Sequence, residues 1–114
     1  LEATVGRLGA RPAEVIAWLG PAISPAHFEV GAEVRAAFTA DDDGADAAFV
    51  ANDRGRWQCD LYALARRRLE RVGVAAIFGG EHCTFAETDR FFSHRRDAGH
   101  TGRMATLIWR NATV

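Results

Sequence analysis

One long segment repeats its apolar positions with helical spacing. In residues 59–72 the apolar residues follow the i, i+3, i+4 pattern, and the arginines lie mainly on the opposite face. Asp60 stands near the start of this segment, and Gly73 follows it, where a glycine commonly ends a helix. The pattern therefore predicts an amphipathic helix over residues 59–72. A shorter helix is expected over residues 1–8, ended by Gly9.

Short apolar runs bounded by glycine or proline indicate strands. Residues 15–19 and 74–78 each have strand length and are followed by such breakers. The first of these is expected to be buried. A third short strand is predicted over residues 47–50, and a final one over residues 103–110, where apolar residues alternate weakly.

The segment between the first two strands is expected to be helical and then acidic. Ser24-Pro25 is a typical helix start, and a helix is predicted to run from there towards Phe38, with Gly31 as a point where it can break. Residues 39–46 are expected to form a solvated acidic loop, and residues 52–56 a turn. Short strands mixed with separate helices predict an α+β fold with mixed sheets and flanking helices.

Composition narrows the class of protein. A chain of 114 residues with 48% hydrophobic and 25% charged residues fits one ordinary domain, residues 1–114. A formal net charge of -1 argues against binding to nucleic acid through bulk charge. No apolar run approaches the ~18 residues of a membrane span, so no membrane partner is expected. All basic residues are arginines, which excludes lysine-based covalent chemistry from these residues.

A loop rich in arginine is the first candidate site. Arg95 and Arg96 precede Asp97, and Arg103 follows after two glycines. Guanidinium groups bind phosphate or carboxylate through two parallel hydrogen bonds. The loop therefore suits an anion site, although a surface network of Arg and Asp side chains explains the composition equally well.

Cys83 is the second candidate, because it follows a predicted strand and a Gly-Gly turn. A nearby His82 or His94 would be needed as its base, and a structural thiol is the more common outcome. Only one other cysteine is present, Cys59, so a reduced, cytoplasmic setting is expected rather than a disulfide framework. His82, Cys83, His94 and His100 are all possible zinc ligands, but their spacing along the chain does not match that of known zinc sites. No metal site is therefore expected within this chain.

Several motifs resemble one family. Residues 83–85, 91–97 and 101–105 look like the C-terminal signature of the YfiH-type laccase-domain family, also called multicopper polyphenol oxidoreductase and described as purine nucleoside phosphorylases. Residues 18–23 and 28–34 agree with it, as does Asp60-Leu61 before the long helix. The sequence departs from the family at His94, where tyrosine is usual, and in a longer loop after Asp97.

The resemblance implies a laccase-domain fold of which this chain is an incomplete half. Family members are about twice this length, so residues 1–114 are expected to be the C-terminal half of a single domain. The family's zinc ligands, His, Cys and His, belong to the N-terminal half, so zinc is expected in the full-length protein but not from this chain alone. The missing N-terminal half is the expected partner, and its absence would leave open sheet edges and exposed apolar surface.

The resemblance also implies an activity, which is phosphorolysis of adenosine, inosine, guanosine and methylthioadenosine, with adenosine deamination as a companion. Purine nucleosides and phosphate are then the expected ligands of a cytoplasmic bacterial enzyme. The expected catalytic residues are Arg95 and Asp97. The expected substrate-binding residues are Arg96, Cys83, Thr84 and Arg103.

Two other readings stay open. One is a cysteine-dependent hydrolase that uses Cys83 with a nearby histidine, and the other is a non-catalytic scaffold fragment. A copper polyphenol oxidase is disfavoured, because copper needs clustered ligands and the four histidines are scattered.

Overall fold

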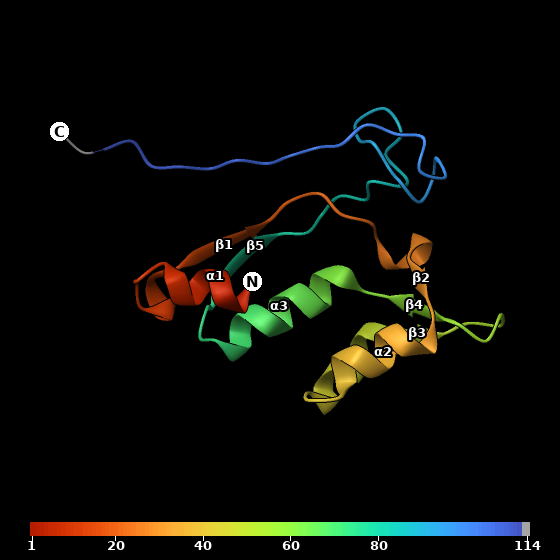
Figure 1. The fold of residues 1–114 in the computed structure, drawn as a ribbon, viewed down its shortest axis with the longest axis horizontal. Helices are drawn as coiled ribbons and strands as arrows, with labels where there is room; N and C mark the ends of the chain where they lie inside the picture. The colour runs from red at the N-terminus through yellow and green to blue at the C-terminus, as the bar shows by residue number, and fades with distance from the viewer. Residues whose placement is uncertain (113–114) are drawn as a thin grey trace.

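The structure is a computed structural model that describes residues 1–112 (Figure 1). It contains three α-helices and five short strands. The helices and strands, in chain order, are α1 (Glu2–Arg7), β1 (Ile16–Leu19), β2 (Glu29–Val30), α2 (Ala32–Thr39), β3 (Phe49–Ala51), β4 (Trp57–Cys59), α3 (Leu61–Arg71) and β5 (Ala76–Gly79). The connections hold 3₁₀ turns at Pro12–Glu14, Pro25–His27 and Asp43–Ala48.

The strands form two separate sheets. β1 and β5 pair in parallel, with Ile16 opposite Ala76. β4 lies between β2 and β3 and is antiparallel to both. The structure therefore confirms the predicted mixture of sheets with flanking helices.

Helix α3 joins the two sheets, because it contributes to both hydrophobic cores. Leu64 is buried in the core beneath the antiparallel sheet, with Phe49 and Cys59. Leu69 is buried beside the parallel pair, with Val5 of α1 and the fully buried Val74. Leu69 follows Leu64 by five positions, which is a net rotation of about 140° around the helix, so the two leucines lie on different sides of α3.

Local signals explain why α3 forms. The Asp60 carboxylate accepts a hydrogen bond from the Ala63 N–H at 2.9 Å, which satisfies one of the free donors at the helix start. Gly73 has φ +93°, the left-handed conformation that ends helices. The prediction of a helix over residues 59–72 is confirmed, except that it begins at Leu61, because Cys59 pairs with Phe49 in β4.

The predicted helix from Pro25 towards Phe38 is wrong in its first half. Only residues 32–39 are α-helical, and Glu29 and Val30 form strand β2 because β4 lies beside them. The Ser24 side chain does not cap a helix. The predicted acidic loop is also partly wrong, since residues 43–48 form a 3₁₀ turn and the Asp42 carboxylate binds Arg67 at 2.5 Å.

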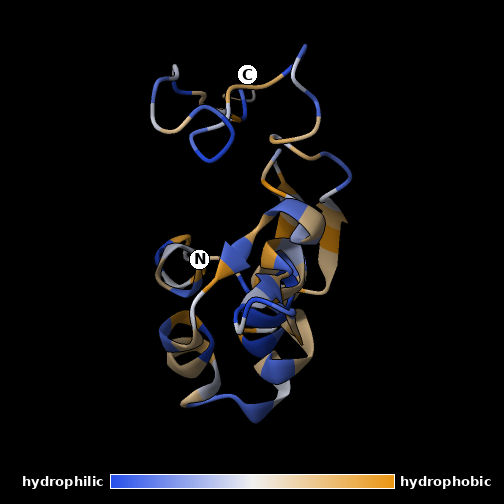
Figure 2. Cartoon of the chain, turned by 90° about the vertical axis from the view of Figure 1, so that its right-hand side faces the viewer, coloured by the Kyte–Doolittle hydropathy of each residue, from blue (hydrophilic) through white to orange (hydrophobic). Residues whose placement is uncertain are grey.

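The prediction of a final strand over residues 103–110 is wrong. The segment is extended and exposed, and it pairs with no strand among the described residues. Figures 1 and 2 show it running apart from the packed helices. The β1 strand is confirmed, but the prediction that it is buried is wrong: Ala17 and Leu19 are only partly buried, and Ile16 and Trp18 are exposed.

Within residues 1–112, no helix has the length and apolar character that crossing a membrane requires.

Candidate active site

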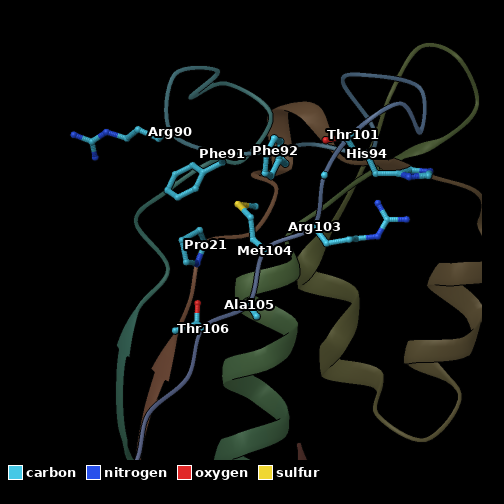
Figure 3. A pocket seen from close by; sticks show the side chains of 11 residues that line it. Pro21, Arg90, Phe91, Phe92, His94, Thr101, Arg103, Met104, Ala105 and Thr106 are labelled. Carbon is cyan, nitrogen blue, oxygen red and sulfur yellow. The ribbon is translucent and has the colours of Figure 1, made fainter.

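The loops after β5 enclose a cleft, which we call the loop cleft. Its larger part is a cavity of about 700 Å³ (Figure 3). Its smaller part is a neighbouring cavity of about 370 Å³, which adjoins the first because the two share four wall residues. The shared walls are Pro21, Phe92, His94 and Met104. Among the residues predicted for the site, Arg103 lines the larger part, and Thr84 and Arg95 line the smaller part.

The larger part of the loop cleft combines charge with aromatic surface. In Figure 3 the side chains of His94 and Arg103 extend in the same direction, and Arg90 points the opposite way. The Thr101 hydroxyl oxygen is buried and has no hydrogen-bond partner among residues 1–112. Cationic side chains, an aromatic wall and a free hydroxyl are the groups that would hold an anionic or planar polar ligand.

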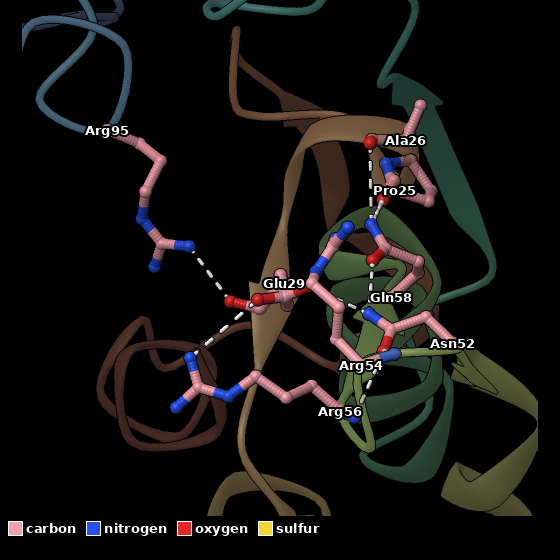
Figure 4. Close-up of polar contacts among 8 residues, drawn as sticks. All are labelled: Pro25, Ala26, Glu29, Asn52, Arg54, Arg56, Gln58 and Arg95. Carbon is pink, nitrogen blue, oxygen red and sulfur yellow. Dashed lines mark hydrogen bonds and ion pairs between the residues drawn. The ribbon is translucent and has the colours of Figure 1, made fainter.

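Arg95 retains most of its hydrogen-bonding capacity. One amino group donates to the Glu29 carbonyl at 2.8 Å (Figure 4). The guanidinium also lies 5.2 Å from the centre of the Phe28 ring. Within the described chain no carboxylate forms an ion pair with it. Its charge therefore stays available to an anion from outside the chain.

The Glu29 carboxylate beside Arg95 is already neutralised by other arginines. It accepts hydrogen bonds from Arg54 and Asn52, and Arg56 lies 3.7 Å away. The Arg54 hydrogen bond holds the pKa of this carboxyl below its usual range, although loss of solvent around the carboxyl acts in the opposite direction. The carboxylate thus stays ionised but does not compete for Arg95.

Arg96 is engaged inside the loop, in contrast to Arg95. Its guanidinium donates to the carbonyls of Thr84, Phe85 and Phe91 at 2.9, 3.1 and 2.9 Å. It also donates to both oxygens of the Asp97 carboxylate at 3.1 Å. Because these contacts occupy the fork of donors, Arg96 and Asp97 tie residues 84–91 to the loop that carries Arg95.

Cys83 lies outside the loop cleft. It lines a separate cavity of about 390 Å³ with Ser24, Tyr62, Arg66 and His82 among others. The sulfur accepts hydrogen bonds from the Ser24 hydroxyl at 3.0 Å, the Ser24 N–H at 3.3 Å and the Ala86 N–H at 3.4 Å. Burial opposes ionisation of the thiol, but these donors outweigh it and hold the pKa of Cys83 below its usual range.

No histidine in the described residues donates to this sulfur. The His82 ring instead lies with Nδ1 3.1 Å from Glu87 Oε1, and Glu87 Oε2 accepts from the Cys83 N–H at 2.7 Å. The cysteine-hydrolase reading stays a prediction, without a base in contact with the nucleophile.

We expect Cys83 to react with a small alkylating reagent at least about tenfold faster than Cys59 near neutral pH. Burial and the nearby Asp60 charge raise the pKa of Cys59 to about 11, so it is almost wholly protonated. Mass spectrometry of peptides after timed labelling measures both rates. Ser24→Ala should slow Cys83 by about threefold, since it removes one donor to the thiolate, and Thr4→Ala on α1 is the control. Equal labelling of both cysteines would contradict the assignment.

Residues 1–112 do not contain a metal site. In the part of the chain that the structure describes, no three His, Cys, Asp or Glu side chains are grouped closely enough to hold an ion. A ligand set for the zinc implied by the family resemblance is therefore absent from residues 1–112.

Sequence reasoning found the loop but missed its partners. Arg95 is positioned by the Phe28 ring and by the Glu29 carbonyl. Glu29 precedes Arg95 by 66 residues in the chain. The sequence predicts Ser24 as a helix cap, whereas its hydroxyl and N–H donate to the Cys83 sulfur. No local pattern marks either contact, since each depends on how distant segments fold together.

Comparison with known proteins matches almost the whole chain to one family. The family model described as multi-copper polyphenol oxidoreductase laccase matches residues 1–111. Over 109 residues the chain is 54% identical to the purine nucleoside phosphorylase YfiH of Shigella flexneri and 53% identical to that of Escherichia coli. Each match covers 96% of this chain and 44% of the relative, so the chain spans less than half of their length.

Solved structures share the fold. A crystal structure of a Neisseria meningitidis protein has a TM-score of 0.83 and 46% sequence identity, covering 86% of this chain and 40% of that one. The Bacillus licheniformis protein YfiH has a TM-score of 0.82 and 31% identity, covering 89% and 40%. The predicted resemblance and fold are confirmed.

Proposed function

Because the chain belongs to the multi-copper polyphenol oxidoreductase laccase family, we propose that it is part of a purine nucleoside phosphorylase and supplies one wall of its active site. The names of the matched relatives support this activity. We further propose that residues 1–114 form the C-terminal half of a single domain, and that the rest of the relatives' length completes the active site.

One observation carries the proposal, which is that the loop cleft joins available arginines to an aromatic wall. Phosphorolysis forms a bond between a phosphate oxygen and C1′ of the ribose, while the bond from C1′ to the purine breaks. In our proposal Arg95 and Arg103 bind the phosphate oxygens, and Phe92 contacts the purine ring. Thr84 lines the smaller part of the cleft beside them.

Three of the predicted site residues take different roles in this proposal. Arg96 and Asp97 become positioning residues in place of the substrate-binding and catalytic roles expected from the sequence, because they bind each other and the loop carbonyls. Cys83 contributes to the neighbouring cavity instead of the loop cleft. Arg95, expected from the sequence to be catalytic in a loop that suits an anion, binds the phosphate in this proposal.

The finer parts of the expected activity remain predictions. They are the choice among adenosine, inosine, guanosine and methylthioadenosine, the companion deamination of adenosine, and a cytoplasmic location. Zinc binding by the full-length protein also remains a prediction, and its ligands are expected outside this chain. Neither zinc nor the copper in the family's description has a ligand set within residues 1–112.

The test uses Arg95→Ala in a full-length enzyme, made by joining this chain to the part of the Escherichia coli relative that it does not match. We expect the KM for phosphate to rise about tenfold, because a charge-assisted hydrogen bond of about 1.5–3 kcal/mol is lost. The KM for the nucleoside should change little. Release of the purine base at varied phosphate concentration measures both.

Arg7→Ala, an exposed arginine at the end of α1, is the matched control. An unchanged phosphate KM in Arg95→Ala would remove Arg95 from the phosphate site. If the unsubstituted enzyme releases no base in a phosphate-dependent way, the proposed function itself is wrong.

A further inference from the structure

The Glu29 carboxylate is well placed to take the free charge of Arg95. Arg95 donates to the carbonyl of the same residue at 2.8 Å, and its side chain extends towards Glu29 (Figure 4). Both residues also line one cavity of about 510 Å³. Rotation about the side-chain bonds of Glu29 is therefore the movement that would join the two charges. The resulting ion pair would occupy the guanidinium that the proposed function assigns to phosphate.

The turn over residues 52–56, between β3 and β4, holds this carboxylate away from Arg95. Arg54 donates from Nε to Glu29 Oε2 at 2.7 Å, and a second nitrogen of its guanidinium contacts the same oxygen. The Asn52 amide donates to that oxygen at 2.8 Å, and an Arg56 nitrogen lies 3.7 Å from Oε1. Because the Glu29 side chain is only 23% exposed, losing Arg54 would leave a partly buried charge that needs another cation.

Asn52 fixes the shape of this turn. Its side-chain oxygen accepts hydrogen bonds from the backbone N–H groups of Arg54 and Arg56 at 3.1 and 3.0 Å. Its amide also donates to the Gln58 side-chain oxygen at 2.8 Å, which ties the turn to β4 (Figure 4). Asparagine commonly stabilises turns through such bonds to nearby backbone groups. Arg54 is therefore presented to Glu29 by a turn of defined geometry.

A second acidic residue, Glu33, lines the same cavity as Arg95 and Glu29. Its carboxylate lies over Gly31 at the start of α2, in the space that a Cβ on Gly31 would need. Within residues 1–112 no arginine forms an ion pair with it. Glu33 thus offers an internal comparison, because it is a nearby carboxylate that Arg54 does not hold.

We propose that Arg54 is a positioning residue for the phosphate site, because its ion pair with Glu29 keeps that carboxylate from pairing with Arg95. The inference rests on the proposed function for the identity of the anion. Phosphate and the Glu29 carboxylate compete for one guanidinium, so a pair formed inside the chain lowers the fraction of molecules that can bind phosphate. Arg54 then raises the affinity for phosphate without touching it.

The experiment measures phosphate binding by the full-length enzyme joined from this chain and the Escherichia coli relative. Titration with inorganic phosphate in the absence of nucleoside gives the Kd. We expect Arg54→Ala to raise the Kd about fivefold, because the released carboxylate pairs with Arg95. Adding Glu29→Gln to Arg54→Ala should return the Kd to within about twofold of the unsubstituted enzyme, since an amide carries no charge to offer Arg95.

Two matched controls separate this competition from simpler effects. Adding Glu33→Gln to Arg54→Ala removes a carboxylate of the same cavity and should not restore binding. Arg11→Ala removes an exposed arginine that pairs with Glu14 at 2.6 Å in the turn before β1, and it should leave the Kd unchanged. Circular dichroism of each variant shows whether it folds.

A second readout needs neither phosphate nor turnover. Phenylglyoxal reacts with two nitrogen atoms of a free guanidinium, so mass spectrometry should show Arg95 labelled about threefold more slowly in Arg54→Ala. Adding Glu29→Gln should restore the original rate.

The inference is overturned if the unsubstituted enzyme binds phosphate and Arg54→Ala binds it equally well. It is also overturned if Glu29→Gln restores neither binding nor labelling, since Arg54 would then act through its own charge or through the fold. The expected labelling pattern, with no phosphate bound by any variant, would support the competition for Arg95 and contradict the proposed function.

Discussion

Replacing Arg96 with alanine is expected to lower the free energy of unfolding by about 3 kcal/mol. The guanidinium satisfies the carbonyls of Thr84, Phe85 and Phe91, and its side chain is only 18% exposed. A partly buried polar group left without a partner costs about 1–3 kcal/mol, and the substitution leaves several. The Asp97 carboxylate would also lose its cation.

Urea unfolding of the chain measures this loss, and Arg90→Ala is the matched control. Arg90 stands in the same loop but is mostly exposed, with one distant ion pair to Glu87 at 3.8 Å, so its replacement should change stability by less than about 0.5 kcal/mol. If the two substitutions have equal effects, Arg96 does not hold the loop together. Preserved stability in Arg96→Ala with loss of phosphate binding would restore the substrate-binding role expected from the sequence.

Leu69→Ala is expected to destabilise the chain by about 3 kcal/mol as well, through a cavity rather than lost hydrogen bonds. Leu69 is almost fully buried and packs with Val5 of α1 and Val74 before β5. Removing its methyl groups would therefore loosen α1 from the rest of the core. Hydrogen exchange of the α1 amides should become faster, in addition to the lower midpoint in urea.

Leu107→Ala provides the comparison, since Leu107 is a leucine of the exposed segment 103–112. Its replacement should leave the urea midpoint unchanged in the chain alone. A similar loss in both variants would mean that this segment packs against the core in solution. A negligible loss in Leu69→Ala would show that the small core beside the parallel sheet adds little to stability.

The parts of the fold that the sequence predicted are those with local causes. Helix α3 carries its periodic apolar face, its Asp60 cap and its terminating Gly73 within one segment. Strand β5 is an apolar run ended by glycines. Strand β2 has no such local cause, because it consists of two residues that become a strand only when β4 lies beside them.

The site divides in the same way. Arginine, aspartate and aromatic residues were recognisable as a candidate anion site from their types alone. The different roles of the two arginines could not be predicted, because they depend on which arginine forms hydrogen bonds within the chain. Arg96 meets three carbonyls and Asp97, whereas Arg95 meets one carbonyl and an aromatic ring.

The position of α3 between the two sheets determines how the chain unfolds. Leu64 belongs to one core and Leu69 to the other, so neither core can lose its packing without uncovering a side of the same helix. Each core alone is small, and a helix of eleven residues is marginal in water without packing. The two sheets therefore share one cooperative unit, in which α3 couples the stability of the loop cleft's supporting strand β5 to that of the distant antiparallel sheet.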